Sequence, residues 1–218
     1  MPGDNLNMYL IQGAAEGNID VVQHLLANGA DIHAEGDAAL RQSSMNGHLD
    51  IVKLLLHAGA DIHATEDSAL RLSASNGQLD VVKFLVEHGA DIHANNNQAL
   101  CDSAENGHLD VVKFLAEHGA NIHVYNDLPL CKSAQNGHLD VVKFLVEMKA
   151  NVRSHCDTAV RSSAWHGHLE IVKFLMEHGA DIHGGYDEAM RRRDAGFESR
   201  TRLGRVLALD SYGHHGIP

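Results

Sequence analysis

The fold is decided by the stretch Asn106-Gly-His-Leu-Asp-Val-Val-Lys-Phe-Leu115, which returns unchanged 30 residues later as Asn136–Leu145. Looser copies occur in the same phase, always 30 residues apart, at Glu16–Leu25, Asn46–Leu55, Asn76–Leu85 and His166–Leu175. A fixed period of about 20–50 residues is typical of stacked repeats, in which each unit contacts only its neighbours. We therefore predict a repeat array rather than a domain with one central core.

Each repeat is predicted to contain two short helices. The second, near residues 109–118, has Val111, Val112 and Leu115 on one face and ends at Gly119. The first is expected to begin at an Asp or Asn whose side chain accepts a hydrogen bond from the amides of the first turn. These residues are Asp37, Asp67, Asn97, Asp127, Asp157 and Asp187. The first helix is expected to end at a glycine in the left-handed conformation. These glycines are Gly47, Gly77, Gly107, Gly137 and Gly167.

The composition favours an intracellular, cytoplasmic protein. No apolar run approaches the roughly 20 residues that span a bilayer, and the first residues lack the pattern of a signal peptide. Cys101 and Cys131 occupy the same position in adjacent repeats. Packed helices lie about 8–10 Å apart, whereas the Cα atoms of a disulfide lie within about 7 Å of each other. We therefore expect both cysteines to remain thiols.

The stretch Asn106-Gly-His-Leu-Asp-Val-Val-Lys-Phe-Leu-Ala-Glu-His-Gly-Ala-Asn-Ile-His123 resembles the second half of an ankyrin repeat. The resemblance covers Asn5 to about Asp194 and implies an all-α, ankyrin-type solenoid of stacked helix-turn-helix repeats. The period is 30 residues instead of the usual 33 or so, so we expect tight inter-repeat turns instead of long β-hairpin fingers. This shorter variety is similar to repeat proteins of large DNA viruses that infect amoebae, which implies the cytoplasm of a host cell.

Two segments are predicted. Residues 5–194 form an ankyrin-repeat array of six repeats plus a partial seventh. Residues 195–218 form an Arg-containing C-terminal cap or tail that is partly disordered. The resemblance implies a non-catalytic, monomeric module that binds another protein through its concave face. The alternative is an adaptor whose array binds a target while the tail recruits other machinery, such as a ubiquitin ligase.

The candidate partner-binding residues lie in the positions that vary among repeats, in the linkers and first helices. By resemblance these segments line the concave face, and aromatic and Arg residues are the usual anchors of interfaces. Neutral drift is the alternative, and it explains the polar changes better than the aromatic ones. The candidates are Arg41, Gln42, Met45, Arg71, Tyr125, Lys132, His155, Arg161, Trp165 and Tyr186.

Enzymatic, metal-binding and nucleic-acid-binding functions are disfavoured. Most of the 18 histidines fall into columns with the 30-residue period, such as His33 with His63 and His108 with His138, so we expect them to bond one repeat's loop to the next. The repeat spacing is too long for ligands to share a zinc ion at about 2 Å. The one local exception is the set His155, Cys156, His166 and His168. We expect no cofactor, and a formal net charge of −12 repels phosphate.

Overall fold

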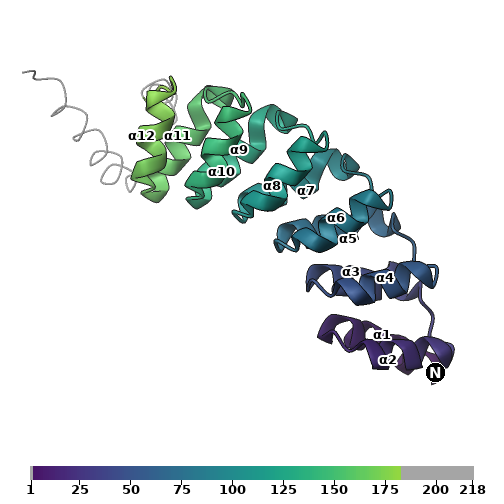
Figure 1. Ribbon diagram of the computed structural model, residues 1–218. Helices are drawn as coiled ribbons and strands as arrows, with labels where there is room; N and C mark the ends of the chain where they lie inside the picture. The colour runs from purple at the N-terminus through teal and green to yellow at the C-terminus, as the bar shows by residue number, and fades with distance from the viewer. Residues whose placement is uncertain (1, 183–218) are drawn as a thin grey trace, which may run out of the picture. The chain divides into compact units, whose positions relative to one another are not determined.

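The computed structural model describes residues 2–182, without the side chains of residues 2–4 and 155–156. These residues form α-helices and no β-strand (Figure 1). The chain divides into two compact units, residues 1–121 and 122–218. The partial seventh repeat beyond residue 182, including Asp187, and the segment 195–218 lie outside the described residues.

The helices form pairs, each consisting of a first and a second helix of one repeat. The first helices of the N-terminal unit are α1 (Pro2–Glu16), α3 (Ala34–Met45), α5 (Ala64–Ser75) and α7 (Ala94–Glu105). Its second helices are α2 (Ile19–Ala27), α4 (Leu49–His57), α6 (Leu79–Glu87) and α8 (Leu109–Glu117). The C-terminal unit contains the pairs α9 (Val124–Asn136) with α10 (Leu139–Glu147) and α11 (Ser154–His166) with α12 (Leu169–Glu177).

Apolar and small side chains hold the pairs together. In α8, Val111, Val112 and Leu115 are buried, which confirms the predicted apolar face. In α7, Ser103 and Ala104 are fully buried, and such small residues let helices approach closely. Accordingly α1, α3, α5 and α7 pack extensively side by side, more so than α2, α4, α6 and α8. The all-α solenoid expected from the sequence is confirmed.

The linkers are tight turns, as the shortened repeat predicts, and their backbone is left-handed. In α5 the residues Thr65, Glu66 and Asp67 have φ angles of 50°, 58° and 55°, so the right-handed helix begins only at Ser68. Three successive left-handed residues also occur at 35–37, 95–97 and 125–127. The left-handed conformation costs an L-residue roughly 1–2 kcal/mol. A compensating interaction must therefore hold each turn.

That interaction comes from the Asp or Asn at the end of each turn. Our prediction that this residue caps its own helix was wrong. An N-cap residue needs an extended backbone to bond its own helix, but Asp37 has a φ of 57°. Its Oδ1 instead accepts a hydrogen bond from the amide of Asp61, 24 residues further on, at 2.9 Å. The same bond, at 2.8–3.0 Å, is made by Asn7, Asp67, Asn97, Asp127 and Asp157 to the amides of residues 31, 91, 121, 151 and 181.

Two columns of histidine take part in this framework in different ways. The Nε2 of His108 lies 3.0 Å from the carbonyl oxygen of Ser75, which confirms the predicted bond to the preceding repeat. His48 and His168 make the same contact. For the other column the prediction was wrong, because the His33 ring contacts Asp37 in its own linker at 3.1 Å. There the link to the next repeat is made by the Asp.

The predicted left-handed glycines are confirmed at the ends of the first helices, with φ angles of 71–86°. At Gly77 a Cβ atom would lie only 2.6 Å from the Nδ1 of His108. Glycine is therefore required there both for its backbone conformation and for the space that the histidine occupies.

We predict that Lys149→Gly stabilises the protein. Lys149 has a φ of 73° at a position where Gly89 and Gly119 stand in other repeats. Removing its Cβ should raise the free energy of unfolding by about 1 kcal/mol, measured by thermal or urea unfolding. The reciprocal change Gly119→Lys is the control and should lower it, because the Cβ there meets no neighbour and only the backbone cost remains. A lower melting temperature for Lys149→Gly would contradict the prediction.

We also predict that the acceptor oxygen of Asp67, and not its charge, is what the array needs. Asp67→Ala leaves the amide of Asp91 without its acceptor and should cost about 1–3 kcal/mol of unfolding free energy. Asp67→Asn should be nearly neutral, because Asn97 already serves the same role one repeat later. Equal losses for both variants in urea unfolding would contradict this account.

Candidate functional site

The three arginines among the candidate residues are half-buried and contact the array itself. Arg41 Nη2 donates to the carbonyl oxygen of Glu35 at 2.8 Å and so contacts the left-handed turn of its own repeat. Arg71 Nη1 lies 3.7 Å from Asp102 Oδ2 of the next repeat. Arg161 Nη2 lies 3.3 Å from Thr158 Oγ1. Their exposed parts remain available, but these side chains also support the fold.

Among the candidates whose side chains are described, the most exposed are two aromatic residues of the C-terminal unit. Tyr125 is 53% exposed in the left-handed turn at the start of α9, and Trp165 is 46% exposed near the end of α11. Gln42, Met45 and Lys132 are half-buried. His155 belongs to α11 but its side chain is not described, and Tyr186 lies outside the described residues. Tyr125 and Trp165 are therefore the candidates whose described side chains are most open to solvent.

Two cysteines interrupt the column of arginines that contains Arg41, Arg71 and Arg161. Cys101 and Cys131 are buried thiols, as expected. Burial, and to a smaller extent the charge of Asp127, raises the pKa of the Cys131 thiol to about 11. Cys131 is therefore unreactive near neutral pH.

The charge of the protein is divided unequally between the two units. Residues 1–121 hold 17 Asp and Glu against 5 Lys and Arg, whereas residues 122–218 hold 12 of each. The entire net charge of −12 therefore belongs to the N-terminal unit. Many of its acids are exposed, at the starts of the second helices and in the linkers. They include Asp20, Asp50, Asp80, Asp110, Asp31, Asp61 and Asp91.

The environment of Asp102, an acid of this unit, opposes its charge. Its Oδ1 accepts a hydrogen bond from Gln98 Nε2 at 2.6 Å. Burial raises the pKa of Asp102, outweighing the lowering effect of Gln98 and Arg71. Asp102 therefore carries its charge at a cost to the fold.

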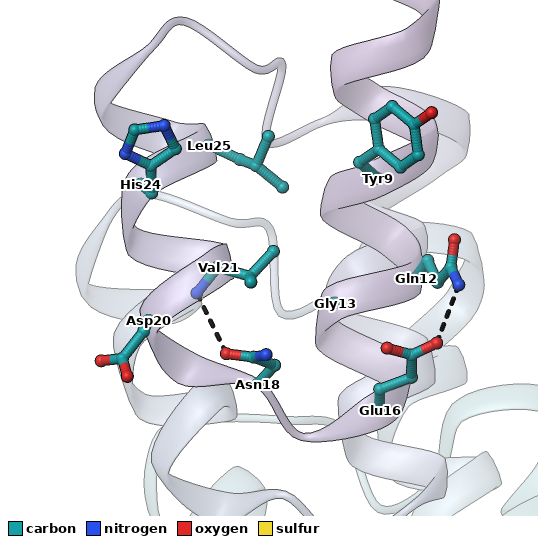
Figure 2. A pocket seen from close by; sticks show the side chains of 9 residues that line it. All are labelled: Tyr9, Gln12, Gly13, Glu16, Asn18, Asp20, Val21, His24 and Leu25. Atoms are coloured by element: carbon teal, nitrogen blue, oxygen red, sulfur yellow. Dashed lines mark hydrogen bonds between the residues drawn. The ribbon is translucent and has the colours of Figure 1, made fainter.

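A groove lies on the outer side of the first helix pair, between α1 and α2 (Figure 2). It has a volume of about 500 Å³, within the range of about 300–1,000 Å³ of ligand pockets. Tyr9 and Val21, which line it, are 51% and 38% exposed. The full lining is Tyr9, Gln12, Gly13, Glu16, Asn18, Asp20, Val21, His24 and Leu25.

Comparison with known protein families agrees with this architecture. A family model described as ankyrin repeats (3 copies) matches residues 4–66, 63–126 and 100–184. The chain belongs to the ankyrin-repeat family. No curated protein matches the chain significantly. Ankyrin repeats are in general protein–protein interaction modules, and their fold is in general a non-catalytic scaffold.

Of the local His and Cys set in this ankyrin-repeat protein, only the side chains of His166 and His168 are described. In the one local set proposed from the sequence, the rings of His166 and His168 are stacked with their centroids 6.2 Å apart. Each ring contacts a backbone carbonyl, of Ser162 and Gln135 respectively. Among the described residues no group of three or more His, Cys, Asp or Glu side chains could hold a metal ion. None of the described helices is long and apolar enough to cross a membrane.

The groove between α1 and α2 was missed by sequence reasoning, although a signal for it exists. Tyr9 stands where the repeats that follow in the N-terminal unit have Ala39, Ala69 and Ala99, all of which are buried. A large, exposed side chain in a column of buried alanines marks the first repeat as different from those that follow. Comparing the first repeat with the others, position by position, would have revealed it.

We predict that Asp102→Asn stabilises the protein at neutral pH. Because the pKa of Asp102 is raised in the folded state, the folded protein binds a proton there more tightly than the unfolded chain. The wild-type protein therefore loses stability as pH rises from the ordinary Asp value through the folded pKa. The advantage of Asn, measured by urea unfolding, should be present near pH 7 and shrink towards about pH 4. The exposed Asp80→Asn is the control, and a constant or reversed difference would contradict the prediction.

Proposed function

We propose that this ankyrin-repeat protein binds another protein through its linkers and first helices, the concave face of ankyrin arrays, and catalyses no reaction. The exposed ring of Trp165 carries the proposal. In the four preceding repeats its column holds Met45, Ser75, Glu105 and Gln135, so the fold does not require an indole. Exposed aromatic side chains in a variable column are typical of interface anchors.

The charge distribution supports a partner with basic surface. A net charge of −12 on residues 1–121 attracts Lys- and Arg-rich surfaces and speeds encounter with them. The same charge repels nucleic-acid phosphates, so we propose no nucleic-acid ligand. Buried thiols at Cys101 and Cys131 are in keeping with the reducing conditions of the cytoplasm, which we propose as the setting.

An adaptor is the second candidate, and the C-terminal sequence is the reason for it. Residues 191–205 contain six arginines against Asp194 and Glu198, in contrast with the acidic N-terminal unit. In an adaptor this segment would recruit other machinery, such as a ubiquitin ligase, while the array holds a target. Affinity capture with the full chain and with a version that ends at Asp194 separates the two candidates. Loss of a captured protein only from the shorter version would favour the adaptor.

We predict that Trp165→Ala weakens binding of the captured partner while leaving the fold nearly intact. The cost in binding should be roughly 2 kcal/mol or more, measured by calorimetry, because a half-exposed indole contributes little to the core. Since Trp165 is the only tryptophan in the chain, its emission should shift to the blue when the partner covers it. The core variant Leu115→Ala is the contrast and should lose about 2–5 kcal/mol of stability. A Trp165→Ala protein that melts far earlier yet binds normally would contradict the proposal.

A further inference from the structure

The geometry points to a second binding surface: the groove between α1 and α2 holds a helix of a partner protein, with an apolar face flanked by Lys or Arg. This inference rests on the proposed function as a protein-binding array and adds a site on the outer side of the first helix pair. The groove is lined by residues 9–25, at α1 and α2 of the N-terminal unit. Tyr125 and Trp165 belong to the C-terminal unit.

The array itself shows what occupies such a groove. Val21 corresponds by the 30-residue period to Ile51 and Val81, which are 2% and 1% exposed. Those residues belong to α4 and α6, on which the preceding helix pairs pack. Val21, in contrast, is 38% exposed. In this fold the equivalent surface is therefore one that accepts a helix.

The alternative is that the first repeat is only a solubilising cap. Terminal repeats of solenoids have a polar outer face, and Glu16 and His24 agree with that role. The floor of the groove does not, because Val21 and Leu25 remain apolar, as in the buried columns. Tyr9 adds further exposed ring surface at a position where other repeats have a small, buried alanine. A cap explains the rim of the groove but not its floor.

Tyr9 also determines which helix fits. Ala39 and Ala69 are 1% and 2% exposed, and their helices α3 and α5 pack on the preceding first helices α1 and α3. A tyrosine ring in their place keeps a standard repeat from approaching as closely. The occupant is therefore a helix of another protein whose surface accommodates the ring, and not the repeat of a second copy of this chain.

The charges at the rim select the polar part of the partner helix. Glu16 and Asp20 are exposed on opposite sides of the groove (Figure 2). Glu16 is held by a 2.8 Å hydrogen bond from Gln12. Asn18 is already engaged, because its side chain accepts a hydrogen bond from the amide of Val21. Two carboxylates beside an apolar floor, on the unit with the whole net charge, favour Lys or Arg next to apolar side chains.

The test is a titration of the full chain with a fluorescently labelled helical peptide of about 15 residues. The peptide carries Leu at positions i, i+3, i+4 and i+7 and Arg at the flanking positions, and its control has Glu in place of every Arg. We expect the Arg peptide to bind and the Glu peptide not to bind. Tyr9→Ala, which introduces the residue of other repeats and should fold, is expected to weaken affinity at least about tenfold.

Matched variants distinguish the groove from general attraction to an acidic protein. Asp20→Asn should lower the affinity for the Arg peptide a few-fold. Asp80→Asn, at the same position two repeats later, should leave the affinity for this peptide unchanged. Equal effects of the two variants, no effect of Tyr9→Ala, or no binding of the Arg peptide would each overturn the inference. Trp165→Ala should not alter peptide affinity. Failure at the groove is thus distinct from failure of the proposed function, which is read from the captured partner at Trp165.

Discussion

The rest of the structure depends on one hydrogen bond, from a loop amide to a side-chain oxygen 24 residues earlier in the chain. It recurs from Asn7 to Asp157 at 2.8–3.0 Å. From Asp37 onwards, each of these acceptors is at least nine-tenths buried. The bond satisfies a loop amide, and it fixes the end of a left-handed turn that would otherwise be unfavourable. Because each bond joins neighbouring repeats, the array is held together by a chain of local links, as expected for a one-dimensional solenoid.

This arrangement separates the residues that hold the fold from those that are left to vary. The buried apolar side chains, the left-handed glycines and the linker Asp or Asn repeat with little change along the array. Between them lie positions such as 125 and 165, where an exposed Tyr and an exposed Trp stand in columns that hold other residue types in neighbouring repeats. A surface whose residues can change without cost to stability is well suited to recognising a protein partner. The same logic explains the groove, where the first repeat keeps its apolar positions but no described helix pair packs on them.

Much of the fold could be predicted from the sequence, because a repeated pattern samples the same structure several times. The two helices of each repeat, the tight linkers and the left-handed Gly77 all follow from the period and from simple backbone rules. The role of Asp37 did not follow, because an Asp before a helix is usually an N-cap and only the structure shows its φ of 57°. The contacts of Arg41 and Arg71 and the groove beside Tyr9 depend on neighbours in space. The geometry of these contacts and of the groove cannot be obtained by comparing equivalent positions of the repeats.

The central claim is that a partner protein covers the variable surface of the array and not its second helices. Hydrogen–deuterium exchange of the chain, alone and with its captured partner, tests this most directly. The account predicts new protection in the linker at residues 124–127 and near Trp165, while the exposed start of α8 at Asp110 exchanges as before. Protection confined to the second helices α4, α6, α8, α10 and α12, with none around Tyr125 or Trp165, would contradict it.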